Sequence, residues 1–266
     1  MLKQTLIASA VASTFLISAT AMAEDAPAGP WELSANVGVV SDYLFRGISQ
    51  THTEPAIQGG FDVSHSSGFH AGVWGSSITW VSDTWGGSYP TEIDVYGGYG
   101  GSISDDLGYD LGLITYNYPG TGSTSPDPNT TEVYGSLSYK WLTLKYSRAI
   151  SSHFVGWTTT GGGDTDGSDY LELNAGYDLG TGWGVSGHVG HQKVKGNGPA
   201  SYTDWNVGVT KDVGFGVVGL TYSSTNSSGS CSSSGGTNAY CWATSSGTDF
   251  EDVSDGTAVV SFSKSF

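Results

Sequence analysis

Positive charge is scarce in this sequence of 266 residues. The chain holds 9 lysines and arginines against 25 aspartates and glutamates, so its formal net charge is −16. Nucleic-acid phosphates are bound by clustered basic side chains, and no such cluster is present. The composition therefore excludes a nucleic-acid partner.

Long apolar runs are missing after the first two dozen residues. The one early run, from Leu6 to Ala21, follows Lys3 and ends at an A-x-A pattern over residues 21–23. This arrangement predicts a secretory signal peptide over 1–23 and a mature domain over 24–266. A transmembrane anchor is the alternative interpretation, but the run is short and stops at a good cleavage site. No later stretch approaches the roughly 18 apolar residues of a membrane helix, so a mature chain that meets a membrane must do so as a barrel.

Cysteine is limited to Cys231 and Cys241, which lie in a Ser/Gly-rich stretch. In an exported chain they are expected to form a local disulfide, because the compartment is oxidising. Two cysteines without nearby histidines make a poor zinc site. The acidic run over residues 164–169 resembles part of a calcium loop, but it lacks the distal glutamate and is better explained as a solvated loop.

Signatures of catalysis are absent from the sequence as well. There is no Gly-x-Ser-x-Gly elbow and no metal-ligand spacing, and the six histidines are scattered. A barrel lipase would need a serine and a histidine that face each other together with an orienting partner. We therefore expect a protein that is not an enzyme and that carries no cofactor or catalytic metal.

Glycine and aromatic residues are abundant instead. The chain has 41 glycines, and Trp, Tyr and Phe make up 12% of it. So many aromatic residues are inconsistent with disorder, and so many glycines disfavour long helices. A single β-rich domain is the expected organisation.

Apolar and polar residues alternate along the mature sequence. In residues 92–99, Ile93 and Val95 share one face of a strand, whereas Glu92 and Asp94 share the other. Period two with a polar second face indicates strands that are buried or lipid-facing on one side only. Twelve such segments are predicted, over residues 33–50, 56–64, 69–80, 92–103, 108–118, 131–139, 142–151, 169–178, 184–193, 203–212, 216–224 and 257–266.

The connections between these segments alternate between long and short through the later chain. This is typical of an outer-membrane barrel with short periplasmic turns and longer external loops. The predicted fold is an all-β, antiparallel, up-and-down transmembrane β-barrel of about twelve strands in the bacterial outer membrane. Its last strand ends at the aromatic Phe266, which we interpret as the signal that barrel-insertion machinery reads. The expected partners are therefore the barrel-insertion machinery and outer-membrane lipid.

One stretch, Ser41 to Thr51 (SDYLFRGISQT), is distinctive. Together with residues 55–62, 67–74, 92–99 and 263–266 it resembles the TorF-type porin family, which comprises outer-membrane proteins of Gram-negative bacteria. The resemblance covers the mature chain and is most specific in its first 80 residues. It implies a fold and a location, but it names no transported solute. His70 and the long loop with the two cysteines depart from the family pattern.

If the apolar positions face lipid, the alternate positions line a lumen. Asp42 and Arg46 then share one face of one strand, ~13 Å apart, so each is expected to meet a charge on a neighbouring strand. The excess of acids predicts a narrow channel for passive diffusion of small polar solutes, cationic or neutral. The residues assigned to this constriction are Asp42, Arg46, Asp62, Asp94, Asp110, Glu132, Lys145 and Glu172.

Several alternatives remain open at this stage. The same charges could form a structural network that plugs the barrel, and Arg46 could make a lumen salt bridge with no role in transport. A non-conducting barrel that acts as a surface adhesin or a ligand-binding protein is the second functional hypothesis, and a soluble sandwich is a third. Aromatic residues near strand ends are interpreted as membrane-interface girdles rather than sugar-stacking platforms: Trp31, Tyr43, Phe45, Trp74, Trp80, Tyr99, Trp141, Tyr177 and Trp183.

Overall fold

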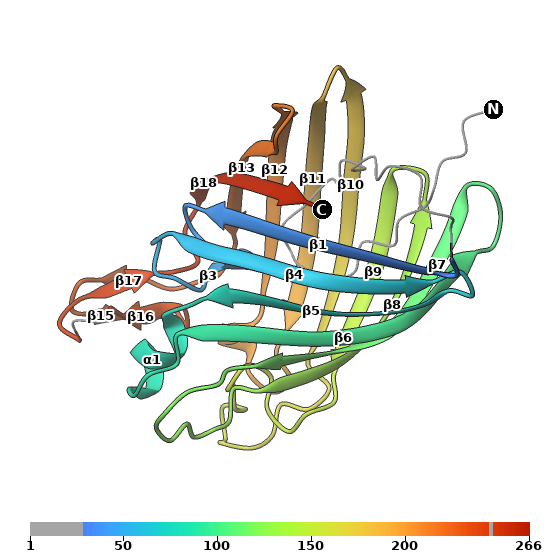
Figure 1. The fold of residues 1–266 in the computed structure, drawn as a ribbon. Coiled ribbons are helices and arrows are strands. Elements are labelled where there is room, and N and C mark those ends of the chain that lie inside the picture. Colours follow the sequence, from blue (N-terminus) through green and yellow to red (C-terminus); the bar gives the residue numbers. More distant parts are fainter. Residues whose placement is uncertain (1–28, 245–246) are drawn as a thin grey trace.

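The computed structural model describes residues 29–244 and 247–266, which form a closed antiparallel β-barrel of twelve strands (Figure 1). The predicted signal peptide lies outside the described residues. Neighbouring strands follow one another in the chain, and β1 and β18 close the barrel through pairs from Asn36–Ser265 to Val40–Ser261. The predicted fold is therefore confirmed.

The barrel strands have the following bounds: β1 Trp31–Val40, β4 Ala56–His65, β5 Phe69–Ser77, β6 Thr91–Ser102, β7 Leu107–Asn117, β8 Thr130–Tyr139, β9 Leu142–Ala149, β10 Asp169–Gly180, β11 Trp183–Lys193, β12 Tyr202–Asp212, β13 Val217–Thr225 and β18 Thr257–Ser265. Helix α1 spans Trp80–Trp85, and the 3-10 helix η1 spans Gly198–Ala200. Among the described residues, no helix is long and apolar enough to cross a membrane.

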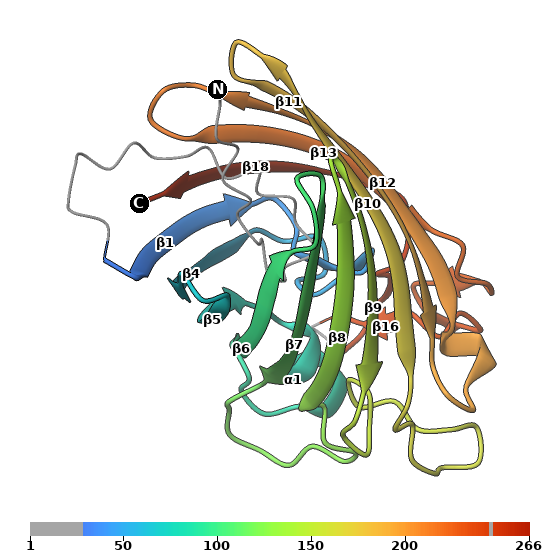
Figure 2. The same ribbon diagram turned by 90° about the vertical axis from the view of Figure 1, so that its right-hand side faces the viewer.

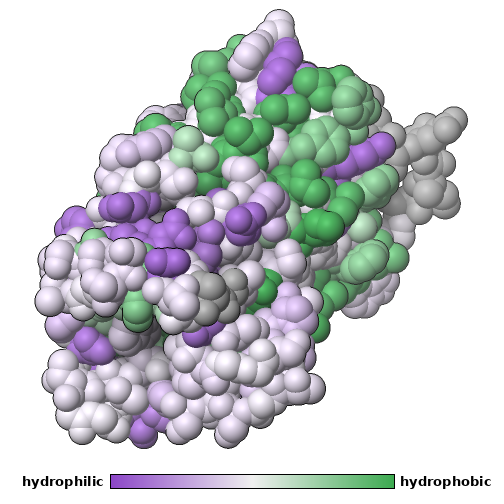
Figure 3. All heavy atoms as spheres, turned by 90° about the vertical axis from the view of Figure 1, so that its left-hand side faces the viewer, coloured by the Kyte–Doolittle hydropathy of each residue, from purple (hydrophilic) through white to green (hydrophobic). Residues whose placement is uncertain are grey.

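The barrel strands place apolar side chains on the outer face and polar side chains inside. On β6, Ile93 and Val95 are 40% and 51% exposed on the outer face, whereas Glu92 and Asp94 are buried inside. Figure 3 shows hydrophobic residues gathered on the barrel wall and hydrophilic ones over the loops. Alternation that turns apolar residues outward is the pattern of a barrel surrounded by lipid.

Long and short connections alternate along the whole chain. The turns at residues 66–68, 103–106, 140–141, 181–182 and 213–216 lie at one end, which we call the turn end. The connections 41–55, 78–90, 118–129, 150–168 and 194–201 lie at the other end, the loop end, together with the described residues 226–244 and 247–256 (Figure 2). The last connection holds β14 Cys231–Ser232, β15 Gly235–Gly236, β16 Cys241–Ala243 and β17 Phe250–Asp252. It also contains the predicted disulfide between Cys231 and Cys241, which is confirmed.

The first predicted strand, 33–50, is too long. Strand β1 ends at Val40, and residues 41–55, which we call the inner loop, fold into the barrel. The inner loop contains the small hairpin of β2 Leu44–Phe45 and β3 Ile48–Ser49. Its two-residue turn is Arg46-Gly47, with positive φ angles of 50° and 80°. A turn of this kind reverses the chain sharply. Because Arg-Gly is not one of the pairs typical of such turns, the sequence was interpreted as one unbroken strand.

The packed core of the molecule lies at the loop end rather than along the barrel. Tyr43, Trp74 and Trp80 are buried in its largest cluster and Phe45 packs against it, so their interpretation as girdle aromatics was wrong. Tyr43 and Phe45 lie in the inner loop, Trp80 lies in helix α1, and Trp74 lies on β5 with its side chain buried. The other members of that set are 40–62% exposed at the turn end, as expected of a girdle: Trp31, Tyr99, Trp141, Tyr177 and Trp183.

Some glycines make room for tyrosines inside the barrel. Gly112 on β7 pairs with Tyr134 on β8, and a Cβ atom at Gly112 would lie 2.4 Å from the tyrosine hydroxyl. Gly72 and Tyr96 repeat the arrangement on β5 and β6. Part of the high glycine content therefore reflects the lumenal tyrosines that lie over neighbouring strands.

Candidate functional site

The inner loop crosses the lumen near the loop end and is held there by its own polar groups. The Asp42 carboxylate accepts hydrogen bonds from Ser49 Oγ at 2.6 Å and Thr51 Oγ1 at 3.1 Å. The backbone N–H of Gln50 donates to the carbonyl of Tyr43 at 2.7 Å. All five residues are buried. Asp42 thus meets hydroxyls of its own loop, and the expectation that it meets a charge on a neighbouring strand was wrong.

Arg46, at the tip of the hairpin, forms the central contact of the site. Its guanidinium donates two hydrogen bonds to the Glu132 carboxylate of β8, at 2.6 and 3.1 Å, and one to Gln192 Oε1 of β11 at 2.7 Å. Arg46 is 4% exposed and Glu132 is fully buried. A bidentate pair of this kind fixes both position and orientation. Arg46 was expected to meet a charge on a neighbouring strand; its partner is a charge on β8, across the lumen.

Aromatic rings complete the surroundings of Arg46. Its guanidinium carbon lies 4.3 Å from the ring centroid of Tyr170 and 4.8 Å from that of Phe45. Burial by itself would lower the pKa of Arg46, but Glu132 raises it above its ordinary value. The inner loop therefore carries a fixed positive charge into the lumen and docks it on the opposite wall.

Beside this ion pair, β6 contributes two buried carboxylates, Glu92 and Asp94. Tyr43 of the inner loop donates a hydrogen bond to Glu92 Oε1 at 3.1 Å. Glu92 Oε2 and Asp94 Oδ1 have no hydrogen-bond partner among the described residues. Asp94 was among the predicted lumen residues and Glu92 was not, although the same alternation places both on one face.

The remaining predicted charges of β4 to β9 lie nearer the turn end, in a separate belt of contacts. Tyr96 donates to Asp62 at 2.6 Å, and His70 contacts Asp110 at 2.6 Å. Lys145 Nζ lies 4.6 Å from the ring centroid of Tyr134. Each of these side chains has a local partner, and among the described residues none of them has a hydrogen bond or ion pair with Arg46 or Glu132.

A third group joins β10, β11 and β12. His188 contacts Asp204 at 2.9 Å and lies 3.7 Å from Glu172, and Tyr170 donates to Asp204 at 2.8 Å. Glu172 was predicted, whereas His188 and Asp204 were missed. The alternation could have identified Asp204. It lies on the same strand face as the polar Asn206, and the apolar Trp205 between them lies on the other face.

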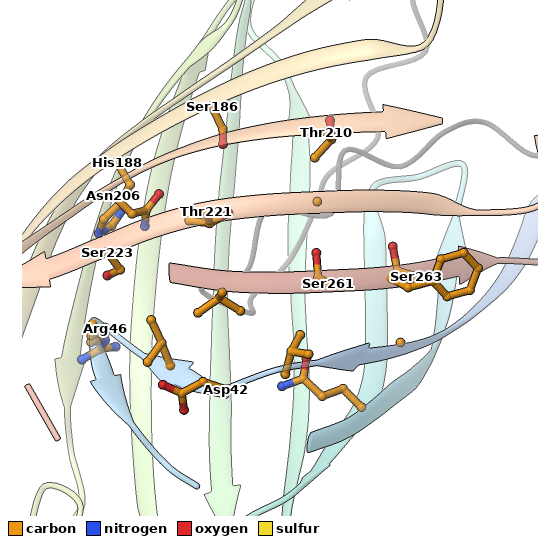
Figure 4. A pocket seen from close by; sticks show the side chains of 18 of the residues that line it. Asp42, Arg46, Ser186, His188, Asn206, Thr210, Thr221, Ser223, Ser261 and Ser263 are labelled. Carbon is orange, nitrogen blue, oxygen red and sulfur yellow. The ribbon is translucent and has the colours of Figure 1, made fainter. Parts of the chain in front are cut away.

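The lumen holds a cavity of about 80 Å³ that is partly open to solvent. Asp42 and Arg46 lie at one end of it, and the view in Figure 4 follows the cavity from them toward Ser263. On β11, β12, β13 and β18 its wall combines hydroxyls, the Asn206 amide, the His188 imidazole and the Asp204 carboxylate with the apolar Val259 and Phe262. The polar members of this wall are Ser186, His188, Asp204, Asn206, Thr210, Thr221, Ser223, Ser261 and Ser263. A lumen of this kind offers hydrogen bonds to a hydrated solute. Among the described residues, no cluster of three or more His, Cys, Asp or Glu could hold a metal ion.

Comparisons with known proteins agree on the fold. The model of a family described as "Bacterial protein of unknown function (Gcw_chp)" matches residues 24–266. No curated protein matches the sequence. Among solved structures, the KdgM porin superposes with a TM-score of 0.53 at 8% identity, over 88% of this chain and 99% of the porin. The NanC porin superposes with a TM-score of 0.50 at 12% identity, over 87% and 98%. At such low identity these likenesses show the fold alone.

Proposed function

The chain belongs to the Gcw_chp family of bacterial proteins, and we propose that it is an outer-membrane channel for passive diffusion of small polar solutes. The observation that carries this proposal is the partly open lumen cavity, which carries hydroxyls and amides beside apolar side chains such as Val40, Trp74 and Val259, inside a barrel whose outer face is apolar. A closed barrel with that outer face is stable in lipid, and a polar lumen is what a hydrated solute needs.

The proposed location is the bacterial outer membrane. It is supported by the outward apolar side chains, by the bacterial family and by the predicted signal peptide. The resemblance of residues 41–51 to TorF-type porins is consistent with it. We further propose that the barrel contacts outer-membrane lipid and that insertion machinery reads the strand that ends at Phe266.

The proposed charge preference is for cations or neutral solutes. The bases that face the lumen are Arg46 and Lys145, and Arg46 is neutralised by Glu132. The acids that face it are more numerous: Asp42, Asp62, Glu92, Asp94, Asp110, Glu132, Glu172 and Asp204. A narrow lumen with an excess of acids repels anions, and its low-dielectric walls strengthen the effect.

Within this channel, we assign the constriction to the inner loop. Its hairpin spans the lumen from the end of β1 to β8 and β11, where Arg46 docks. A solute must pass beside this loop, on the side of Asp204 and Ser223, or the loop must move. The other predicted charges are proposed to set the electrostatic potential of the lumen rather than its width.

The second candidate function is a barrel that does not conduct and instead binds a ligand at its loop end. The packing of the inner loop against three buried clusters favours it, because these clusters fill much of the external mouth. The two candidates differ in a single property, the flux of ions and solutes through the barrel.

The experiment is to record ionic currents through the refolded protein in planar bilayers under a KCl gradient. The proposal predicts discrete conductance steps and a reversal potential of the sign expected for cation preference. Liposome swelling with uncharged sugars of increasing size would then define the size limit for neutral solutes. Absence of steps from protein that shows heat-modifiable gel mobility would favour the second candidate, and anion preference would overturn the proposed selectivity.

A further inference from the structure

We infer that the loop end holds a second, separate binding site, for a small uncharged aromatic compound that carries a hydrogen-bond acceptor. The site is a cavity of about 110 Å³, which we call the outer cavity. Small-molecule sites are commonly apolar and furnished with a few polar groups. Its aromatic lining includes Trp80, Trp85, Trp157, Tyr202, Tyr240 and Trp242.

The inner loop separates the outer cavity from the lumen cavity. Phe45 and Ile48 line the outer cavity, whereas Leu44, Arg46 and Gly47 line the lumen cavity. The other walls of the outer cavity come from the long connections at the loop end, around residues 80–85, 154–157 and 240–242. A ligand can therefore reach it without passing through the barrel, and binding there does not depend on conduction.

The rings around the outer cavity already pack against one another in the geometries that aromatic pairs favour. Trp80 and Trp242 have centroids 5.9 Å apart at an interplanar angle of 30°, and Trp157 and Tyr240 are 5.6 Å apart at 74°. A further ring could continue this arrangement by stacking or edge contacts. The walls thus fit a flat apolar ligand.

The polar groups of the outer cavity narrow the choice of ligand. None of the described residues that line it is Asp, Glu, Lys, Arg or His, so a charged ligand would lose its hydration without gaining a counter-ion. Trp80 is 3% exposed, and its Nε1–H has no hydrogen-bond partner among the described residues. Buried indole N–H groups normally have a partner, so this donor points to a ligand that supplies an acceptor.

Three of the neighbouring donors, those of Trp85, Trp242 and Tyr240, are already satisfied. Trp85 Nε1 donates to the carbonyl of Ser125 at 3.1 Å, and Trp242 Nε1 donates to that of Ala239 at 3.0 Å. Tyr240 donates to the carbonyl of Ala200 at 2.6 Å. A sugar would bring many hydroxyls to a cavity with few open partners, and each unpaired hydroxyl would cost free energy. A single aromatic ring with one carbonyl fits better.

The test is to titrate the refolded protein in detergent with acetophenone and follow binding by saturation-transfer NMR, with heat-denatured protein in the same micelles as the blank. Cyclohexyl methyl ketone lacks the ring, benzoate adds a charge, and glucose tests the sugar alternative. We expect saturable binding of acetophenone, weaker binding of the cyclohexyl ketone, and none of benzoate or glucose.

Two variants locate the site. Trp80→Phe keeps a ring but removes the N–H donor, and it should weaken acetophenone binding about fivefold, the loss expected for one hydrogen bond. Trp141→Phe, at the exposed turn end, is the matched control and should leave affinity unchanged. Thr84→Phe, which places a ring into the cavity, should abolish binding.

Three results would each overturn the inference. The first is that acetophenone shows no saturable binding above the blank. The second is that the wild type and Trp80→Phe bind acetophenone with equal affinity. The third is that the wild type prefers glucose or benzoate to acetophenone. The ligand series on the wild type tests binding and ligand preference even if a variant fails to fold. A variant that fails to fold is identified by the loss of heat-modifiable gel mobility. Because no current is measured, the result stands apart from the test of conduction.

Discussion

Arg46 of the inner loop and Glu132 of strand β8 are joined across the lumen by two hydrogen bonds, at 2.6 and 3.1 Å, with both side chains buried. The pair links the start of the barrel to its opposite wall, over a sequence separation of 86 residues. It holds the inner loop inside the lumen. The proposed constriction depends on this contact.

The first prediction concerns the stability that this pair confers. Arg46→Met leaves the Glu132 carboxylate buried without its cation, and it should destabilise the barrel by about 3–5 kcal/mol. The double variant Arg46→Met/Glu132→Gln should recover part of that loss. The stability of both variants can be measured as the temperature at which the folded band disappears in heat-modifiable gel electrophoresis. Lys140→Met is the control, because Lys140 is half exposed and its Nζ lies 3.6 Å from the Asp106 carboxylate. Equal stability of Arg46→Met and the control would contradict the prediction.

The second prediction concerns charge selectivity and pH. Burial raises the pKa of the Asp42 carboxyl above its ordinary value, although hydrogen bonds from Ser49 and Thr51 lower it. The pKa of an exposed aspartate is about 3.9. Because the pKa of Asp42 is raised, Asp42 is protonated at a higher pH than an exposed aspartate. Cation preference should therefore weaken on acidification before the exposed acids titrate.

Asp42→Asn should remove that early part of the pH dependence and reduce cation preference at neutral pH. Asp105→Asn, in the turn over residues 103–106, is the matched control and should behave as the wild type. Reversal potentials in a KCl gradient at several pH values provide the measurement. An unchanged pH profile in Asp42→Asn would show that Asp42 does not set selectivity.

The third prediction tests the glycine–tyrosine packing. Gly112→Ala places a Cβ atom against the Tyr134 ring and the carbonyl of Gly97, and it should destabilise the barrel by about 1–3 kcal/mol. Gly187→Ala, where the nearest atom lies 3.9 Å away, should have little effect. The two variants can be compared by the temperature at which the folded gel band disappears. Similar temperatures would mean that the glycine is not required at position 112.

The fourth prediction concerns the disulfide in the last external loop. Replacing Cys231 and Cys241 together by serine should leave the barrel band on the gel unchanged, because both residues lie beyond β13 and before β18. The loop itself should be cleaved faster in limited proteolysis, since the cross-link restricts its open conformations. Loss of the folded barrel band would show that the loop supports the barrel as well.

Much of the fold could be predicted from sequence because the barrel is built on local rules. Alternation of apolar and polar residues assigned the strands, and alternation of connection lengths assigned their up-and-down order. The boundary of the first strand could not be found in this way, since Arg46-Gly47 is not one of the residue pairs typical of two-residue hairpin turns. Only the positive φ angles there show that the chain reverses.

The candidate site was predictable as a set of residues but not as a set of contacts. Alternation places a side chain inside the barrel, and it did so for Asp62, Asp94 and Glu172. It does not say which inward side chains meet, because that depends on register and on how far the loops fold in. The docking of Arg46 on Glu132 and the outer cavity both depend on such long-range packing.

The most direct test of the account is the single-channel conductance of the wild type compared with Arg46→Ala in planar bilayers. The account predicts small, cation-preferring steps from the wild type and larger steps from Arg46→Ala, because the inner loop loses its anchor on β8 and the constriction widens. Lys140→Ala should conduct as the wild type does. Folded protein in which neither the wild type nor Arg46→Ala conducts would contradict the account.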